Sequence, residues 1–355
     1  MQRRQFLLTP IALVTFTASA APVFPRVEAG VPLVFPRDHG SHPAFRTEWW
    51  YITGWVTDAS GRDFGVQITF FRSRTGIGEA STSRFKPTQL LFAHAAIADP
   101  GHGRLRHDQR IARVGWGIAE ATETTTNVRL DGWSLALVGN QYQAKLEARE
   151  FSLDLAFAAK SPPLLQGREG VSRKGPHPDQ ASFYYSRPQL DTTGSITIGT
   201  RRRQVRGTAW LDHEWSSEYL APETRGWDWL GINLDDGGAL MLFRIRARNG
   251  SVFWAGGTWS NAAGESRFFG PNEVTFESRR EWKSPRTGLT YPVAFRVRAG
   301  GLDLTIEPLL DDQELDARGS VGTIYWEGAV RASAAGSAIG RGYLELTGYG
   351  TPLRI

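Results

Sequence analysis

The chain of 355 residues contains no cysteine and only two methionines. Without cysteine, disulfide bonds, thiolate metal sites and haem attached through cysteine are all excluded. Helix-forming periodicity is also nearly absent, because no long segment repeats apolar residues at positions i, i+3, i+4 and i+7. After the N-terminus no apolar run is long enough to span a bilayer. We therefore expect a soluble chain, free of disulfides and built from strands.

Several common catalytic signatures are missing as well. There is no Gly-x-Ser-x-Gly elbow, no P-loop and no dinucleotide-binding fingerprint. The histidines are His39, His42, His94, His102, His107, His177 and His213. The closest pair, His39 and His42, lies in a loop flanked by Gly and Pro rather than on a regular element. We expect no metal and no cofactor.

The N-terminus resembles a twin-arginine export signal. Arg3-Arg4 is followed by a spacer, by Phe6-Leu7 and by apolar residues up to about residue 20. Ala18-Ser19-Ala20 has the small-x-small pattern that signal peptidase needs, which predicts a signal peptide over residues 1–20 and a periplasmic or secreted protein. Folding in the reducing cytosol before export agrees with the absence of cysteine. The alternative is an uncleaved membrane anchor.

The charge is modest and favours no nucleic-acid partner. The formal net charge is +5, and removing Arg3 and Arg4 with the signal leaves +3. The densest basic cluster is Arg201–Arg203 with Arg206. No aromatic residues interleave it, so we interpret it as a solvated hairpin turn.

Alternating apolar runs separated by Gly, Asn and Asp indicate β-hairpins. The clearest hairpins join Trp49–Val56 to Phe64–Phe71, Trp227–Leu234 to Leu240–Arg246, and that last run to Val252–Trp259. Many short strands at this spacing predict an all-β protein made of antiparallel barrels or sandwiches. The 335 residues after the signal are enough for two domains, each with its own core. We place the boundary near residues 218–224 and interpret residues 158–180 as a surface loop.

Ionisable groups are set among aromatic residues in the middle of the chain. Side chains alternate between the two faces of a strand. His213 and Trp215 should therefore share one face, and Asp212 and Glu214 the other. In the next strand Trp227 and Trp229 share a face. We expect these tryptophans and His213 to line one cavity.

A third aromatic strand lies near the start of the mature chain. Glu48 and Trp50 should share one face there, with Tyr51 on the other. Together the candidate ligand-binding residues are Trp215, Trp227, Trp229, Trp50, Tyr51, Glu48 and Tyr185. The simplest alternative is an aromatic core whose charges point to solvent.

Three motifs, taken together, resemble the carotenoid 1,2-hydratase and AttH-like family. They are Glu48–Tyr51, Trp210–Trp215, and Tyr325–Val330 with Gly342–Tyr349. The resemblance covers nearly the whole mature chain. It implies two lipocalin-like antiparallel β-barrel domains, at residues 30–218 and 219–355.

The resemblance also implies chemistry on a lipophilic alkene. Some members hydrate an alkene of a carotenoid or a prenylated isoflavonoid, some relatives are cyclases, and AttH-like proteins have no firmly assigned reaction. The His-x-Trp of the hydratases matches His213 and Trp215. The hydratases also carry an acid on the strand after the mid-chain motif, and residues 240–244 contain none.

Two functions follow as rival hypotheses. In the first, a cofactor-independent hydratase or cyclase protonates an alkene with a carboxylic acid whose pKa an apolar wall raises. The candidate acids are Asp212, Glu214 and Asp228, with Asp228 preferred. A tertiary cation would lie against Trp215 and Trp229, at about 1–2 kcal/mol per ring, and His213 would orient or deprotonate the water.

The second hypothesis is a carrier that binds a lipid or isoprenoid without chemistry. Peripheral association with envelope membranes and an envelope transport partner are further expectations of that function. A purely structural envelope protein is the remaining alternative.

The export signal generates the first testable prediction. Replacing Arg3 and Arg4 with Lys should strand the precursor in the cytoplasm, because the twin-arginine pathway needs both guanidinium groups. Cell fractionation and immunoblotting measure this. Arrival of the unaltered precursor in the periplasm of a strain without that translocase would contradict the pathway.

Overall fold

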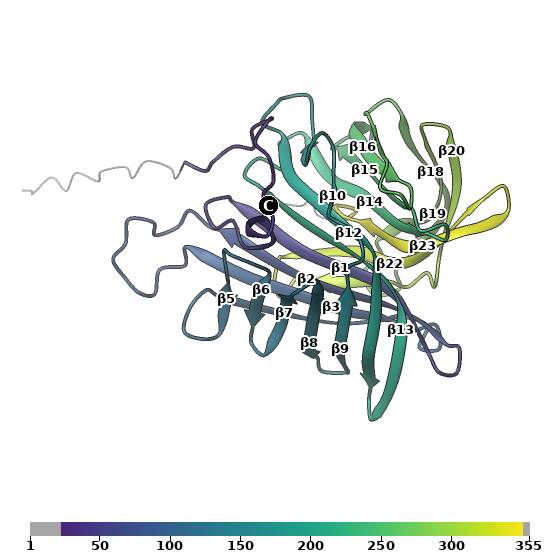
Figure 1. Ribbon diagram of the computed structural model, residues 1–355, viewed down its shortest axis with the longest axis horizontal. Helices are drawn as coiled ribbons and strands as arrows, with labels where there is room; N and C mark the ends of the chain where they lie inside the picture. The colour runs from purple at the N-terminus through teal and green to yellow at the C-terminus, as the bar shows by residue number, and fades with distance from the viewer. Residues whose placement is uncertain (1–22, 351–355) are drawn as a thin grey trace, which may run out of the picture.

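The fold is known from a computed structural model that describes residues 23–350. The predicted signal at residues 1–20 lies outside the described residues. Apart from a short 3-10 helix, η1 (Arg37–His39), the regular elements of the described chain are strands of two antiparallel sheets (Figure 1). No helix within this range is both long enough and apolar enough to cross a membrane.

The first sheet, called the first barrel, has its strands in the order β4-β3-β2-β1-β13-β12-β9-β8-β7-β6-β5, with β10 and β11 also paired to β12. Its strands are β1 (Thr47–Asp58), β2 (Asp63–Arg74), β3 (Gln89–Ala98), β4 (Leu105–Arg113), β5 (Ala119–Ala121), β6 (Asn127–Leu130), β7 (Trp133–Val138), β8 (Gln141–Glu147), β9 (Phe151–Ala158), β10 (Leu164–Leu165), β11 (Val171–Arg173), β12 (Ala181–Ile198) and β13 (Arg201–Ser216).

The second sheet, called the second barrel, runs β17-β16-β15-β14-β23-β22-β20-β19-β18, with β21 paired to β22. Its strands are β14 (Thr224–Leu234), β15 (Ala239–Ala247), β16 (Val252–Ser260), β17 (Ser266–Phe269), β18 (Val274–Lys283), β19 (Thr290–Ala299), β20 (Leu302–Pro308), β21 (Glu314–Ala317), β22 (Thr323–Ala334) and β23 (Ser337–Leu346). The expected all-β class with two lipocalin-like barrels is confirmed. The domain limits of 30–218 and 219–355 stay predictions.

Burial alternates along the strands that have one face in solvent, but not along β1. β8 alternates buried and exposed residues, as expected for a strand with one face on a core and the other in solvent. Almost every residue of β1 is buried. One of its faces lines the first barrel and the other meets the second barrel.

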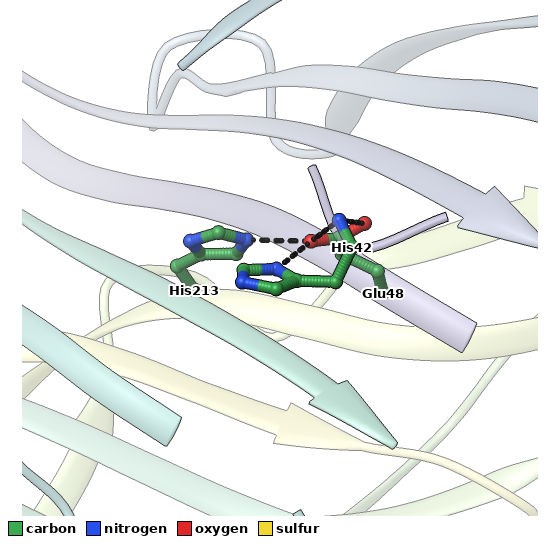
Figure 2. Close-up of side chains that lie close together, drawn as sticks. All are labelled: His42, Glu48 and His213. Carbon is green, nitrogen blue, oxygen red and sulfur yellow. Dashed lines mark hydrogen bonds and ion pairs between the residues drawn. The ribbon is translucent and has the colours of Figure 1, made fainter. Parts of the chain in front are cut away.

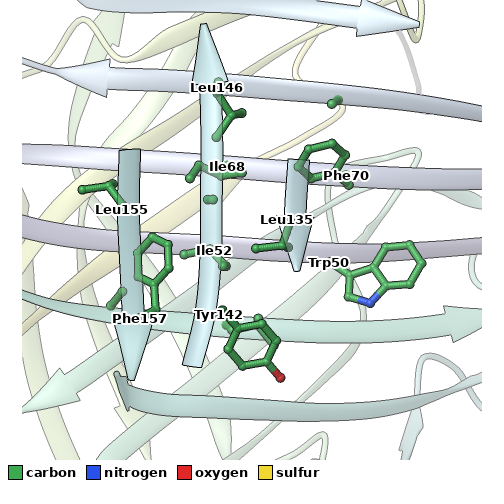
Figure 3. Close-up of a cluster of buried hydrophobic side chains, with 14 of the residues drawn as sticks. Trp50, Ile52, Ile68, Phe70, Leu135, Tyr142, Leu146, Leu155 and Phe157 are labelled. Carbon is green, nitrogen blue, oxygen red and sulfur yellow. The ribbon is translucent and has the colours of Figure 1, made fainter. Parts of the chain in front are cut away.

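The core of the first barrel forms where its sheet curls over on itself. Trp50 and Ile52 of β1 point inward beside Ile68 and Phe70 of β2, and meet side chains of β7, β8 and β9 from the opposite wall (Figure 3). A separate core fills the second barrel. Each barrel therefore has its own hydrophobic interior.

Aromatic side chains also join the two barrels. The indole N–H of Trp55 in β1 donates a hydrogen bond to the carbonyl of Gly342 in β23, at 2.9 Å. Gly65 in β2 lies so close to β22 and β23 that a Cβ there would come within 2.6 Å of the Tyr343 hydroxyl and 2.7 Å of the Ala329 Cβ. The contact between the barrels is thus closely packed.

The interpretation of residues 158–180 as a surface loop is wrong in one respect. The segment contains β10 and β11, which pair with β12, and it includes Lys174, which is only 3% exposed. Its Gly and Pro content signalled a loop, but two short strands fit between the turns.

Close packing between the barrels predicts that Gly65→Ala destabilises the protein by about 1–3 kcal/mol, the usual cost of overpacking. Urea unfolding measures the free energy of unfolding. Gly270→Ala is the matched control, because the nearest atom to its new Cβ would be 3.7 Å away. Equal stability of the two variants would contradict the close approach.

Candidate functional site

The pairing of β1 with β13 positions two different groups of side chains. Glu48 lies opposite Trp215, Trp50 opposite His213, and Tyr51 opposite Asp212. Successive side chains of a strand point to opposite faces. Glu48, Trp50, His213 and Trp215 therefore point into the first barrel, whereas Tyr51 and Asp212 point toward the second. The expected face assignments within each strand are confirmed.

On the inner face, Glu48 is the centre of a buried hydrogen-bonded cluster. One of its oxygens, Oε1, lies 2.8 Å from Nδ1 of His42 and 3.0 Å from Nε2 of His213 (Figure 2). The other, Oε2, accepts a hydrogen bond of 2.7 Å from Nε of Arg72. We call these four residues the Glu48 cluster.

Electrostatics keep Glu48 ionised inside the barrel. Burial raises the pKa of the Glu48 carboxyl, but the charge of Arg72 and hydrogen bonds from His213 and His42 outweigh it and hold the pKa well below its usual value. Burial lowers the pKa of His213 against the opposing effect of Glu48. The cluster thus combines a carboxylate with a neutral His213.

Tyr185 and Trp215 complete this inner cluster. The Tyr185 hydroxyl lies 3.2 Å from Nδ1 of His213, and Trp215 stacks on the His42 ring at 3.6 Å and 6°. The imidazoles of His42 and His213 and the carboxylate of Glu48 offer metal-ligand atoms within 4.8 Å of one another. Arg72 already neutralises that carboxylate, so the geometry matches an ion-paired cluster; the expectation of no metal stays a prediction.

The outer face of β1 and β13 borders a pocket between the two barrels, which we call the inter-barrel pocket. Its cavity volume is about 110 Å³, enough for several water molecules on a scale where one needs roughly 10–15 Å³. About half of the residues that line it are aromatic, and four carboxyl groups face it. Asp212, Glu214 and Glu327 are buried, and Glu345 is half-buried.

Among residues 23–350, Asp212 has three hydrogen-bond donors and forms no ion pair. The Tyr184 hydroxyl donates at 2.7 Å and the Trp210 indole at 2.6 Å, and Ser186 donates as well. Burial raises the pKa of Asp212 to about 7, although these hydrogen bonds work in the opposite direction. Asp212 can therefore exchange a proton near neutral pH.

Glu214 is instead neutralised by a lysine. Nζ of Lys174 lies 2.8 Å from Oε1 of Glu214, and both residues are buried. The ammonium group also lies 4.5 Å from the centre of the Phe243 ring and 4.9 Å from that of Tyr184. Burial raises the pKa of Glu214 against the opposing charge of Lys174.

The predicted site residues do not all meet in one cavity, and that expectation is wrong. The core of the first barrel and the adjoining Glu48 cluster contain His213, Trp215, Trp50 and Tyr185. The residues that line the inter-barrel pocket are Trp227, Trp229, Tyr51, Asp212 and Glu214. β13 and β14 belong to different sheets, so the alternation along β13 does not continue into β14.

Asp228, the preferred acid, points into the second barrel. Its oxygens accept hydrogen bonds from Nε of Arg244 at 2.6 Å, Nε of Arg246 at 3.1 Å and the Tyr349 hydroxyl at 3.0 Å. It is absent from the pocket wall. Alternation had already placed it opposite Trp227 and Trp229.

Sequence reasoning missed three residues of the pocket wall and the lysine that neutralises one of its acids. Glu327 and Glu345 stood inside the C-terminal family motif, and their position two residues from Tyr325 and Tyr343 could have marked them as inward-facing. His94 sits in an apolar strand, β3, and had no such signal. Lys174 was hidden in the presumed loop.

Comparisons with known proteins agree with this architecture. A family model described as AttH-like matches residues 26–349. The chain belongs to the AttH-like family. A search of curated proteins finds no match.

Solved structures extend the similarity. A crystal structure of an AttH protein from Nitrosomonas europaea is 47% identical, with a TM-score of 0.87 over 92% of this chain and 100% of that one. Kievitone hydratase from Nectria haematococca shares 13% identity and a TM-score of 0.70, over 93% and 97% of the two chains. CghA, solved with Sch210972, shares 12% sequence identity and a TM-score of 0.54, over 87% of this chain and 90% of that one. The last two similarities show a shared fold.

The raised pKa of Asp212 predicts a pH dependence of stability. Between its unfolded pKa near 4 and about 7, the folded carboxyl holds a proton that the unfolded chain has lost, so the free energy of unfolding falls as pH rises. Asp212→Asn should remove up to about 4 kcal/mol of this decline.

Urea unfolding at a series of pH values from about 4 to 8 measures the effect, over the range in which the linkage acts. Asp235→Asn, in an exposed turn, is the control and should follow the wild-type profile. An Asp212→Asn profile parallel to wild type would show that Asp212 ionises in the folded protein as it does in the unfolded one.

Proposed function

We propose that this AttH-like protein binds a lipophilic, isoprenoid- or lipid-like molecule in the inter-barrel pocket and protonates an alkene of that molecule without a cofactor. The observation that carries the proposal is a pocket with aromatic side chains in its wall and four carboxyl groups, three of them buried and one half-buried. An apolar wall favours an apolar ligand, and burial keeps a carboxylic acid protonated at neutral pH.

The aromatic wall also suits the intermediate of such a reaction. Protonation of a substituted alkene leaves a carbocation, which the π face of an aromatic ring stabilises by about 1–2 kcal/mol in a desolvated site. Three aromatic rings that could do so line the pocket, those of Trp227, Trp229 and Tyr51. The fold shared with kievitone hydratase supports a hydratase-type reaction.

We further propose that the protein is exported and acts in the periplasm or as a secreted protein. A carrier would use the same pocket for binding alone. The two functions differ in whether the bound alkene exchanges hydrogen with solvent, which the acid catalyst requires and the carrier does not.

Binding to the pocket can be tested with the fluorescent apolar probe N-phenyl-1-naphthylamine, displaced by farnesol. Trp227→Ala should weaken the binding of both ligands about tenfold or more, because removing a ring that lines the pocket forfeits at least about 1.4 kcal/mol of apolar contact. Trp227→Phe should retain most of the affinity.

Trp215→Ala is the matched control, because Trp215 points into the first barrel on the other side of the wall. It should leave the affinity within about twofold of wild type if the variant stays folded. No binding to wild type, or equal losses in Trp215→Ala and Trp227→Ala, would contradict the proposed pocket.

A further inference from the structure

Glu327 and Glu345 form a pair of facing carboxyl groups. They are directly opposite residues on β22 and β23, a position in which Cβ atoms lie about 4.5–5.5 Å apart. Both face the inter-barrel pocket, and Glu327 is only 2% exposed. Neither position was among the expected acids.

This pair lacks the partners that the other pocket acids have. Within residues 23–350 no Lys, Arg or His forms an ion pair with Glu327 or Glu345. Glu345 accepts one hydrogen bond, from the Trp227 indole at 2.9 Å. Oε1 of Glu327 is buried without a hydrogen-bond partner among the described residues. Asp212 has three donors and Glu214 has Lys174, so these two carboxyl groups are the least compensated of the pocket.

Two carboxylates placed so close in an apolar environment cannot both ionise. Burial and then the charge of Glu345 raise the pKa of Glu327 well above its usual value. Burial raises the pKa of Glu345 to about 7, against a hydrogen bond from Trp227. The hydroxyl groups of Tyr51 and Tyr325 oppose the rise in the pKa of Glu327 but do not outweigh it. At neutral pH the pair therefore retains a proton.

A chain of hydrogen bonds leads toward solvent from Tyr325, whose hydroxyl acts to lower the pKa of Glu327. Tyr325 precedes Glu327 by two residues on the same face of β22, and its hydroxyl lies 2.7 Å from Nδ1 of His94. Nε2 of His94 lies 2.8 Å from Oγ of Ser320. The Ser320 hydroxyl donates to Oε1 of Gln109 at 2.6 Å.

Each central member of this chain can both donate and accept a proton. Burial lowers the pKa of His94 to about 3, so its ring is neutral, with one nitrogen donating and the other accepting. Ser320 is half-buried, and its neighbour Gly319 and partner Gln109 line a second, polar cleft with a volume of about 730 Å³. Solvent thus reaches the outer end of the chain.

We propose that the Glu327–Glu345 pair is the proton-donating site of the inter-barrel pocket, and that Tyr325, His94 and Ser320 connect it to solvent. The proposal rests on the proposed function and names its acid. The ligand class it fits is an apolar molecule with a branched, electron-rich alkene, because only such an alkene yields a stabilised cation without a metal or cofactor.

The step balances without a further reactant. The carboxyl O–H breaks as the alkene π electrons form a C–H bond, which leaves a carboxylate and a cation on the adjacent carbon. Water adds a lone pair to that carbon, and the oxonium proton returns to the carboxylate. The net reaction adds one water, and the acid is regenerated.

The shared proton can be tested without any ligand by infrared difference spectroscopy of the whole protein at neutral pH. Wild type should show the C=O band of a protonated buried carboxyl that shifts in D₂O. Glu327→Gln and Glu345→Gln should each alter or abolish that band. Glu314→Gln, another buried glutamate of the second barrel, should leave it unchanged. A band unaffected by both pocket substitutions would overturn the proposal.

Donation to carbon is tested with farnesol in D₂O, followed by mass spectrometry of the recovered alcohol. Wild type should incorporate deuterium at alkene carbon, and Glu327→Gln should be at least about a hundredfold slower, the usual contribution of a general acid. Unchanged incorporation in Glu327→Gln would overturn the proposal. So would an absence of incorporation in wild type that binds farnesol, although binding in the proposed function would then stand.

The connection to solvent has its own readout, the rate of hydrogen–deuterium exchange of the carboxyl band. Ser320→Ala should slow this exchange about tenfold, and Ser320→Thr, which restores a hydroxyl, should return it to near the wild-type rate. A merely structural Ser320 would change stability in both variants without separating their exchange rates. Equal exchange in wild type and Ser320→Ala would overturn the path through His94.

Discussion

The antiparallel pairing of β1 with β13 determines which side chains of the first barrel face the site. Its register sends alternate residues to opposite faces, so a slip of one residue would exchange the two sets of side chains. With Trp50 opposite His213 and Tyr51 opposite Asp212, an ion-paired cluster lies inside the first barrel and an acid faces the second. A single two-stranded ladder thereby forms the wall between a barrel core and a pocket.

Buried carboxyl groups have different stabilising partners on the two sides of this wall. Inside the first barrel Glu48 has Arg72 and two imidazoles, so the cost of burying a carboxylate is offset by ion pairing and hydrogen bonds. In the inter-barrel pocket compensation decreases from Glu214, which has a lysine, through Asp212, which has neutral donors, to the pair formed by Glu327 and Glu345. A carboxyl group without compensation avoids the cost of burial by keeping its proton.

Local patterns in the sequence were enough to predict the strands and their faces. The alternation that places His213 with Trp215, and Asp212 with Glu214, depends only on neighbouring residues and is confirmed. The single cavity expected for His213 and Trp229 required knowledge of how β13 meets β14 across residues 217–223, and no periodicity extends through that connection. Non-local strand pairing decided the arrangement instead.

The same limit applies to the partners of the acids. Asp228 was the preferred acid because two tryptophans adjoin it, but Arg244 and Arg246 arrive from the next strand and occupy its oxygens. Glu327 and Glu345 come from the end of the chain and reach the pocket only because β23 pairs with β14. Which carboxyl lacks a cation is a property of the assembled barrels, and short motifs do not contain it.

At 13% sequence identity, the similarity to kievitone hydratase shows a shared fold. The chemistry depends instead on the side chains that lie between the barrels. In this protein Gly65 allows the barrels to approach closely, and Trp55 of β1 donates a hydrogen bond to β23. As a result, packed aromatic rings enclose the pocket. Exclusion of water strengthens every electrostatic effect inside such a site. Close contact between the barrels is therefore the physical reason that acids on three different strands retain protons at neutral pH, and any change that loosens the contact would hydrate them and return their pKa values toward ordinary ones.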